Sequence, residues 1–392
     1  MSGAAPVALV ASPREREIDA ALEILASGRP LLPLHPRHSP EERARTVARV
    51  MESEIPDGTG AILATSGSTG EPKLCALSTD ALFASARASR ANIPLGRGDR
   101  WLLVMSFAHA GGLSILTRCL EAGASVVGIE ADAFSTARVI EALRSGVTHV
   151  SLVPTMLAKL LDEGGGDALA SVRAALVGGA ACPPALYERA RREGVPILTT
   201  YGLTEAGSQV STQRLAEPAR RTASDSGDPL GGTRVSIERG RIVVRGPTLM
   251  SGYLGAPPIR GVFETEDVGR VDEEGRLHVL GRADDMIVTG GENVHPLEVE
   301  RALASITGVE AALVCGIPDP TWGEIVGAVV VLTEGARLEA IDEEARSALP
   351  SFRVPRRWKP VPALPIAPSG KPDRRAARAL FTHEVGASTG PH

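Results

Sequence analysis

The sequence predicts an α/β protein with a large N-terminal domain built mostly on parallel sheets and a small α+β C-terminal domain. Three observations carry this prediction. Short apolar runs alternate with helix-like segments between about residues 60 and 202, Gly-punctuated strands follow up to 282, and a new α+β pattern begins after Asp284 and Asp285. Alternating strands and helices are typical of parallel sheets covered by helices. We therefore expect an N-terminal domain over residues 1–283, with a small β subdomain, and a C-terminal domain over residues 284–392.

The elements follow from local patterns in chain order. Buried strands are predicted within residues 60–67, 100–107, 124–130, 148–154, 172–179 and 195–202, and helices within 77–91, 111–123, 133–146 and 183–194. Alternating strands around a turn at Arg239 and Gly240 predict the β subdomain. The C-terminal domain is predicted to contain strands at 310–316 and 323–333, helices at 296–305 and 338–349, and a Pro-rich tail.

Composition excludes several classes of protein. The 392 residues are 43% hydrophobic and 23% charged, a composition typical of a globular protein. The net charge of -5 provides no overall positive charge that would attract nucleic acid or an anionic membrane. Four cysteines without a CxxC pair fit free thiols of a reducing compartment better than a zinc site or disulfides. No apolar run approaches the roughly 18 residues of a membrane span, and the N-terminus fits a signal peptide poorly. We expect a cytoplasmic protein without membrane insertion or a nucleic-acid partner.

A loop of small residues ending in a lysine is the first candidate site. It follows a predicted strand and consists of Thr65, Ser66, Gly67, Ser68, Thr69, Gly70, Glu71, Pro72 and Lys73. Its glycines permit positive φ, its amides and hydroxyls can bind phosphate oxygens, and Lys73 adds positive charge. It is not a P-loop, because Pro72 precedes the lysine and Leu74 follows it. The alternative is an ordinary surface loop.

A second segment, TTYGLTE at residues 199–205, lies where another strand is predicted to end. Thr204 can bond a phosphate, and Glu205 could hold Mg²⁺, which takes one or two carboxylates and keeps several waters. The alternative is a helix N-cap with an acidic first turn. The two loops together indicate a nucleoside triphosphate site.

Five segments in order resemble the motifs of adenylate-forming ligases, the family of acyl-CoA synthetases, luciferases and adenylation domains. They are TSGSTGEPK (65–73), TYGLTE (200–205), ETEDVGRVDEEG (264–275), GRADDMIVTGGENVHPLEVE (281–300) and PSGKPDRRAAR (368–378). The resemblance covers roughly residues 30–380. It implies two half-reactions: a carboxylate attacks the α-phosphate of Mg-ATP to give acyl-AMP and pyrophosphate, and the thiol of CoA then displaces AMP.

The resemblance also implies residue roles. Lys371 bridges the acyl carboxylate and the α-phosphate, Asp267 binds the ribose hydroxyls, and Arg282 assists near the ribose. The C-terminal domain is mobile and rotates about Asp284 between the half-reactions. Further ATP or AMP contacts are expected from Gly179, Ala180, Thr200, Tyr201 and Gly202, and the thiol tunnel from Gly290, Gly291 and Glu292. Glu266 replaces a family glycine, and it would strain the loop if that position required a positive φ.

Three stretches bear on the acid. His109 resembles the family histidine that gates the acyl pocket, Gly178 and Gly179 resemble the floor beneath the acyl group, and Ser208 and Gln209 follow the second motif. This last stretch is most similar to the o-succinylbenzoate-CoA ligases of menaquinone biosynthesis. A polar Ser-Gln pair suits an aromatic acid with a second carboxylate, since a buried carboxylate needs donors.

Two alternatives remain open. The first is another aryl- or short-chain acyl-CoA ligase. The second is a noncatalytic acyl-adenylate-binding remnant, because family members usually carry about 60–100 further residues before the segment at 31–44. The pocket is then expected to close differently, or the chain to be a truncated product. The expected partners are a carboxylic acid, ATP and CoA, and a homodimer is left open.

Overall fold

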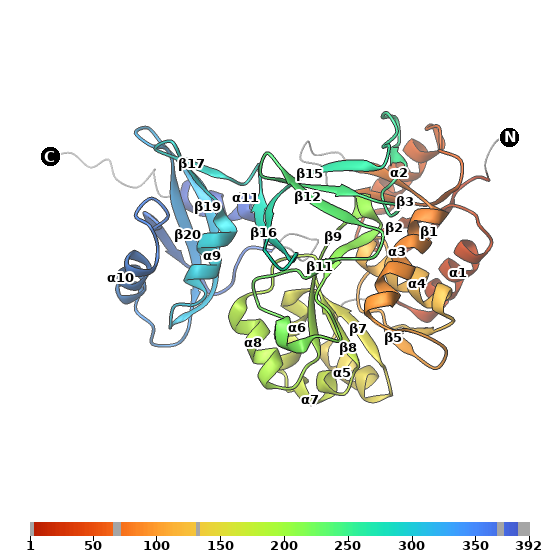
Figure 1. The fold of residues 1–392 in the computed structure, drawn as a ribbon, viewed down its shortest axis with the longest axis horizontal. Coiled ribbons are helices and arrows are strands. Elements are labelled where there is room, and N and C mark those ends of the chain that lie inside the picture. The colour runs from red at the N-terminus through yellow and green to blue at the C-terminus, as the bar shows by residue number, and fades with distance from the viewer. Residues whose placement is uncertain (1–3, 66–71, 131–133, 367–371, 383–392) are drawn as a thin grey trace.

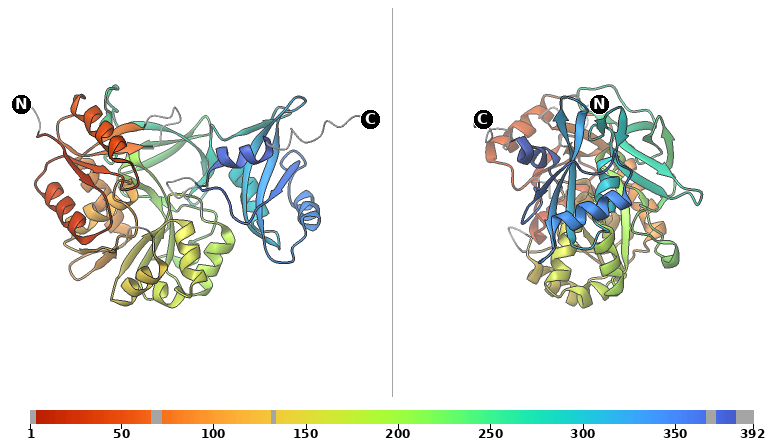
Figure 2. Two further views of the ribbon diagram at one scale, coloured as in Figure 1. Left: turned by 180° about the vertical axis from the view of Figure 1, so that it is seen from behind. Right: turned by 90° about the vertical axis from the view of Figure 1, so that its left-hand side faces the viewer.

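The computed structural model describes residues 4–65, 72–130, 134–366 and 372–382. These residues form a large lobe, which the chain builds up to Arg282, and a smaller lobe from Ile287 onward (Figures 1 and 2). The predicted fold class, a mixed α/β protein with a large N-terminal and a smaller C-terminal part, is confirmed. No described helix is both long enough and apolar enough to cross a membrane.

The first sheet of the large lobe lies near the N-terminus. Its order is β1 (Val7–Val10), β2 (Leu31–Leu34), β3 (Thr59–Thr65), β4 (Lys73–Ser78) and β14 (Gly252–Tyr253). Its helices are α1 (Glu15–Ala26), α2 (Pro40–Met51), which Ser39 and Glu42 begin with a capping box, and α3 (Thr79–Asn92). We expected the strand at 60–67 to join the sheet of the later strands, and this was wrong. It is β3, and it pairs antiparallel with β4, which we did not predict.

The second sheet is the parallel one. Its order is β11 (Asp228–Pro229), β10 (Ser208–Thr212), β9 (Ile197–Leu203), β8 (Ala174–Val177), β7 (His149–Leu152), β5 (Arg100–Leu102) and β6 (Ser125–Val127). The strands from β9 to β6 are parallel, whereas β10 and β11 are antiparallel additions. The helices are α4 (Ala110–Ala122), α5 (Thr136–Arg144), α6 (Pro154–Asp162), α7 (Gly166–Ala170) and α8 (Pro184–Arg192).

Alternate residues of the parallel strands enter two separate cores. Leu176 and Leu198 pack with α1, α3 and α4, whereas Val177 and Ile197 pack with α5, α6 and α8. This two-sided burial explains why these strands are apolar throughout. The carboxyl ends of β8 and β9 are consequently held rigidly between two layers of helices.

The third sheet belongs to the large lobe and corresponds to the predicted β subdomain. Its strands are β12 (Arg234–Glu238), β13 (Arg241–Arg245), β15 (Val262–Val271) and β16 (Leu277–Arg282). The turn at Arg239 and Gly240 has positive φ at both residues (52° and 82°), as a tight hairpin turn requires. Glu266 lies within β15 and does not have a positive φ, so the replaced glycine creates no strain here.

The small lobe is one mixed sheet with helices. The strand order is β18 (Glu292–Val294), β17 (Ile287–Thr289), β20 (Gly323–Leu332) and β19 (Val309–Asp319), with β21 (Arg357–Pro360) beside β20. The helices are α9 (Pro296–Leu303), α10 (Leu338–Ala348) and α11 (Arg374–Thr382). The tail that we predicted only as Pro-rich contains β21 and α11, whose Ala377 and Phe381 pack on Leu313 and Ile317. The amide of Ala283 still donates to Glu266 at 2.8 Å, and the domain boundary at 283/284 remains our proposal.

His149 should make the stability of the large lobe depend on pH. It is fully buried on β7, and its ring stacks on Trp101 at 5.0 Å. Burial lowers the pKa of His149 to about 4 from the usual 6.5. An unfolded histidine therefore binds a proton more readily than the folded one, so stability is full above pH 6.5 and falls as the pH approaches 4.

We expect His149→Gln to remove this dependence. Wild type should lose about 3 kcal/mol more unfolding free energy than the variant between pH 7 and pH 4. Urea unfolding at several pH values measures the difference. Parallel curves for the two proteins would contradict the assignment.

Candidate active site

The carboxyl end of β9 brings the predicted nucleotide motifs together. We predicted a strand that ends at Gly202; β9 ends one residue later, at Leu203, and Thr204 and Glu205 lie in a following 3₁₀ turn, η1 (Thr204–Ala206). A Cβ on Gly178 would lie 2.6 Å from the Thr200 side chain, and one on Gly202 would lie 2.0 Å from the Ser208 carbonyl oxygen. Glycine is therefore required at both positions. Gly179, with φ +79°, and Ala180 follow β8 beside this strand end.

The predicted ribose residues meet across two sheets. The Tyr201 hydroxyl donates to the Asp267 carboxylate at 2.6 Å, and Asp267 is opposite Arg282 in the register of β15 and β16. Burial, and then the Asp267 charge, raise the pKa of Tyr201, so the phenol stays protonated and remains a donor. The Arg282 guanidinium makes two bonds, of 2.8 and 2.9 Å, to the carboxylate of Asp284, the proposed hinge residue.

Tyr253 connects the two predicted phosphate motifs, and we did not identify it from the sequence. Its hydroxyl donates to the Glu205 carboxylate at 2.5 Å, and the Lys73 ammonium lies 5.1 Å from its ring centroid. Burial, and then the bond to Glu205, raise the pKa of Tyr253. Thr65 ends β3 beside Lys73, whereas Ser66, Gly67, Ser68, Thr69 and Gly70 lie outside the described residues. Tyr253 is one of only three tyrosines in the sequence, and this scarcity was the available clue.

One oxygen of the Glu205 carboxylate is thus held by Tyr253 in a site that also contains Lys73. A single oriented carboxylate suits Mg²⁺, which is usually completed by waters and substrate phosphates. Among the described residues, no group of three or more His, Cys, Asp or Glu side chains could hold a metal by itself. Glu205 is therefore the side chain we would assign to Mg²⁺.

Ser208 and Gln209 lie at the start of β10, opposite Leu203 and Gly202 of β9. Gln209 is 3% exposed, and its amide nitrogen bonds Thr212 at 2.6 Å and Thr200 at 3.4 Å. Its carbonyl oxygen is buried with no hydrogen-bond partner among the described residues. Ser208 has φ 132°, a strained value for a residue other than glycine, next to an irregularity in the pairing of β10.

His109 immediately precedes α4, and its ring lies 5.0 Å from that of His35. His35 follows β2, and the sequence gave no reason to select it beyond its place in a His-rich loop. Burial, followed by the charges of His109 and His38, lowers the pKa of His35 to about 4. His35 is therefore neutral at physiological pH beside the predicted gating residue.

Arg118 on α4 is a buried cation that sequence reasoning also missed. The residue is 2% exposed, and its three guanidinium nitrogens have no hydrogen-bond partner in the described part of the chain. The guanidinium lies 5.2 Å from the Trp101 ring centroid. Burial lowers the pKa of Arg118 to about 10, so it remains charged at neutral pH. Helix α4 packs against α3 and against β10, which carries Gln209.

The residues predicted for the thiol tunnel lie in the small lobe. Gly290 and Gly291 form the turn from β17 to β18 with φ of +59° and +88°, and Glu292 begins β18. Gly290 packs against Trp322, because a Cβ there would lie 2.5 Å from the indole ring. Lys371 lies outside the described residues.

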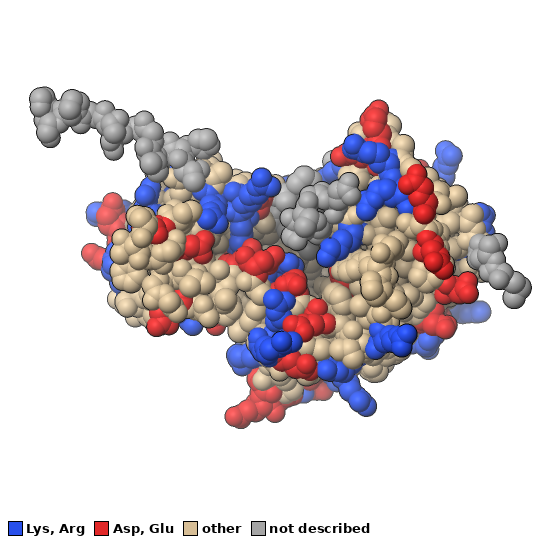
Figure 3. Space-filling model, turned by 90° about the horizontal axis from the view of Figure 1, so that it is seen from above, with Lys and Arg blue, Asp and Glu red and all other residues tan. Residues whose placement is uncertain are grey.

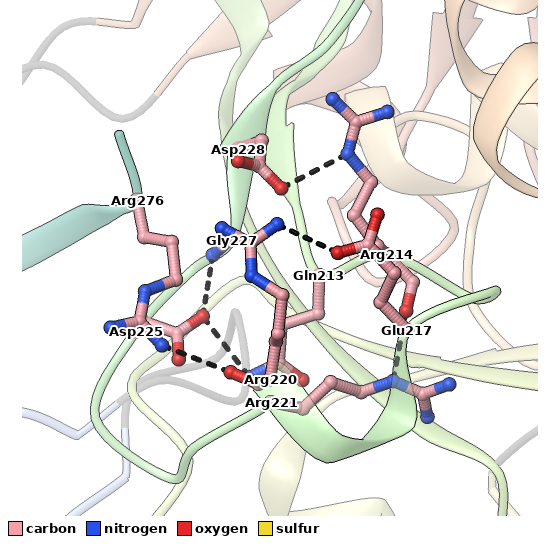
Figure 4. A pocket seen from close by; sticks show the side chains of 9 residues that line it. All are labelled: Gln213, Arg214, Glu217, Arg220, Arg221, Asp225, Gly227, Asp228 and Arg276. Carbon is pink, nitrogen blue, oxygen red and sulfur yellow. Dashed lines mark hydrogen bonds and ion pairs between the residues drawn. The ribbon is translucent and has the colours of Figure 1, made fainter. Parts of the chain in front are cut away.

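A small cavity of about 10 Å³ occurs at a different place, around the loop that follows β10 (Figure 4). Its lining residues are Gln213, Arg214, Glu217, Arg220, Arg221, Asp225, Gly227, Asp228 and Arg276. Arg214 pairs with Asp228, and Gln213 bonds Asp225 and the amide of Thr199. These mutual bonds support β9, and the volume suits about one water.

On the face in Figure 3, acidic and basic side chains are interspersed over both lobes.

The strand end thus brings bonded Tyr201 and Asp267 near Lys73 and an oriented Glu205, the side chains that the sequence predicted for a nucleotide site of the adenylate-forming class. Comparison with known proteins agrees. The model of the AMP-binding enzyme family matches residues 5–254, and that of the AMP-binding enzyme C-terminal domain matches residues 298–371. The chain belongs to the AMP-binding enzyme family and is an AMP-forming ligase.

Curated relatives are similar over most of the chain. The 2-succinylbenzoate--CoA ligase of Geobacillus sp. (strain WCH70) is 35% identical over 349 residues, covering 84% of this chain and 69% of the relative. That of Bacillus subtilis (strain 168) is 33% identical over 332 residues, covering 80% and 68%. The predicted resemblance to this subfamily is confirmed.

Solved structures agree with these relatives. The o-succinylbenzoate CoA synthetase from Bacillus subtilis, in complex with the acyl-adenylate intermediate OSB-AMP, superposes with a TM-score of 0.75 at 29% identity, covering 99% of this chain and 84% of that one. The amide bond synthetase McbA from Marinactinospora thermotolerans has a TM-score of 0.83 at 27% identity, covering 97% and 90%. ATP-bound MatB from Rhodopseudomonas palustris, at 23% identity and a TM-score of 0.85, shares the fold; it covers 97% and 89%.

We expect Tyr253→Phe to weaken metal-dependent adenylation while leaving the fold intact. The change keeps the ring that contacts Lys73 and removes only the hydroxyl that orients Glu205. Loss of such an outer bond typically raises the metal requirement about tenfold or more. The Mg²⁺ concentration for half-maximal pyrophosphate release measures the effect.

Tyr187→Phe is the matched control. Tyr187 is a buried tyrosine that bonds Gln213 at 3.2 Å, so this change should alter stability without changing the Mg²⁺ requirement. An unchanged Mg²⁺ requirement in Tyr253→Phe would show that the bond to Glu205 has no role in metal binding.

Proposed function

We propose that this chain is an ATP-dependent ligase that converts o-succinylbenzoate into its CoA thioester through an acyl-adenylate, the step named by its relatives and used in menaquinone biosynthesis. The proposal is supported by those relatives and by the polar character of the interior beside β10. The observation that carries it is the set of buried polar groups without partners on α3, α4 and β10. In the described residues these are Ser85, Ser89, Arg118, Gln209 and Ser211.

An acid with a second carboxylate fits this set better than an aliphatic acid does. Burying an unpaired polar group costs free energy, and burying an unpaired charge costs more. A fatty-acid tunnel would offer no hydrogen-bond partner to the Arg118 guanidinium. A dicarboxylate such as o-succinylbenzoate would bring acceptors for the guanidinium into the same region.

The nucleotide roles follow the family resemblance. Lys73 and the loop from Thr65 hold the β- and γ-phosphates, Thr204 bonds a phosphate, and Glu205 holds Mg²⁺. Asp267, oriented by Tyr201, binds the ribose, with Arg282 beside it. Gly179, Ala180, Thr200 and Gly202 border the adenine and the acyl group.

The two half-reactions use different arrangements of the two lobes. Lys371 stabilises charge while the acyl carboxylate attacks the α-phosphate, and such preorganised electrostatics can supply several kcal/mol. Rotation about Asp284 then removes Lys371 and brings the segment from Gly290 to Glu292 to the thiol, with His109 gating the acyl group.

The compartment and assembly are also proposals. All four cysteines are free and buried among the described residues, which suits the reducing cytoplasm. A homodimer remains the assembly to test by light scattering.

Pyrophosphate release with Mg-ATP and CoA tests the function across o-succinylbenzoate, benzoate, acetate, a medium-chain fatty acid and an amino acid. We expect release with o-succinylbenzoate, accompanied by its CoA thioester. Turnover of benzoate or acetate alone would favour another acyl-CoA ligase. Bound ATP without release on any acid would favour the noncatalytic remnant.

Gln209→Leu tests the polar pocket. The change removes a buried amide whose N–H groups donate to Thr212 and Thr200 and are the donors that Gln209 can offer to a substrate carboxylate. We expect kcat/KM for o-succinylbenzoate to fall at least about tenfold, since a lost buried hydrogen bond to a charged group costs roughly 1.5–3 kcal/mol. Benzoate, which lacks the second carboxylate, is the internal control. Equal losses on both acids would show that Gln209 acts only on the fold.

A further inference from the structure

Two consecutive aspartates between the lobes are held by arginines that belong to opposite sides. Asp284 bonds Arg282, the last residue of β16 in the large lobe. Asp285 accepts a bond of 3.2 Å from Arg374, the first residue of α11 in the small lobe. The carboxylate of Asp284 is thus bonded to the large lobe, and that of Asp285 to the small lobe.

The Arg374 attachment is the more extensive of the two. Its guanidinium bonds both oxygens of Glu300 on α9 and the carbonyl oxygen of Val314 on β19, at 3.3 Å. Glu300 also accepts the Val314 amide at 2.8 Å. One arginine therefore joins α11, α9 and β19 to the segment between the lobes.

The exposed fractions of the side chains indicate which of these ion pairs can break. The side chains of Arg374, Asp285 and Glu300 are 22%, 34% and 12% exposed, whereas those of Arg282 and Asp284 are 46% and 47% exposed. Water screens an exposed pair, so it contributes little, while breaking a largely buried pair leaves an uncompensated charge. Asp284 can therefore change its partner during rotation, and Asp285 stays with the small lobe.

The backbone supports the same division. Ala283 is still bonded to β15 through Glu266, and Ile287 already pairs with Val294 in the small-lobe sheet. Only residues 284–286 lie between these two attachments. The chain's freedom to turn is consequently confined to three residues, with Arg374 fixing their far end.

We propose that Arg374 is a positioning residue for adenylation: by joining Asp285 to Glu300 and β19, it fixes the start of α11, the helix that Lys371 precedes by three residues in the sequence. The inference rests on the proposed function, because it concerns the half-reaction that uses Lys371. The bonds of Arg374 go to Asp285, Glu300 and Val314, so its effect on adenylation is indirect. Loosening the start of α11 should therefore impair the half-reaction that uses Lys371 more than it impairs thiol transfer.

The test compares both half-reactions in Arg374→Ala, Arg374→Lys and Arg378→Ala. Arg378 is the matched control, because it lies on the same helix and makes only a 3.6 Å ion pair with Glu324. Adenylation is followed by pyrophosphate release, and transfer by CoA thioester formation from supplied acyl-adenylate. A small displacement of a catalytic group can cost as much as about a hundredfold, so we expect Arg374→Ala to lose at least tenfold in adenylation and little in transfer.

Arg374→Lys should fall between wild type and Arg374→Ala, since an ammonium keeps the charge but cannot span Asp285, Glu300 and Val314. Arg378→Ala should retain both half-reactions. Lys371→Ala provides the reference for a pure adenylation defect. Equal loss of both half-reactions in Arg374→Ala and Arg374→Lys, or no loss in either, would overturn the proposal.

Amide hydrogen exchange separates this inference from the proposed function. Arg374→Ala should exchange faster at residues 284–286 and at the start of α11, with β20 unchanged, whichever acid the enzyme uses. Unchanged exchange there would overturn the positioning role. A wild-type protein inactive on every acid would instead count against the proposed function.

Discussion

The close approach of three strands at the end of β9 is the constraint on which the candidate site depends. Gly202 allows β10 to pass against the backbone, and Gly178 allows the end of β8 to approach Thr200. A Cβ at either position would overlap atoms of the neighbouring strand, so the strands would have to move apart. Because they do not, the successive residues of β9 face different neighbours: Thr200 meets β10, and Tyr201 reaches Asp267 on β15.

Electrostatics then joins this strand end to elements that are distant in the sequence. Two of the three tyrosines in the chain donate to carboxylates of the site, Tyr201 to Asp267 and Tyr253 to Glu205. Both phenols have a raised pKa, caused first by burial, and therefore act as permanent donors. A carboxylate held in this way presents its remaining lone pairs in one direction, which a ribose or a metal ion requires.

Local patterns in the sequence predicted the family, the parallel strands and the nucleotide motifs, because each of these depends on residues close together in the chain. They did not predict β4, whose six residues begin at Lys73 and pair antiparallel with β3. They also missed α11. The proline-rich segment before it favoured an irregular tail, although Ala377 and Phe381 give the helix an apolar face. His35, Arg118, Tyr253 and Arg374 were missed for a different reason. Each depends on a partner or on burial that arises only when the chain folds. The absence of strain at Glu266 could likewise be seen only from the folded backbone, in which its φ is not positive.

Arg118 shows how magnitudes favour an anionic partner over a purely structural role. Desolvation of a buried ion costs several kcal/mol, whereas a cation–π contact such as that with Trp101 returns about 0.5–2 kcal/mol. Burial alone would be relieved by loss of the proton, yet the pKa of Arg118 falls only to about 10, so the charge persists at neutral pH. The contact with Trp101 therefore leaves a deficit that the described residues do not offset. An anionic ligand bound beside Arg118 would offset it, and such a ligand would then stabilise the large lobe as well as determine which acid the proposed ligase accepts.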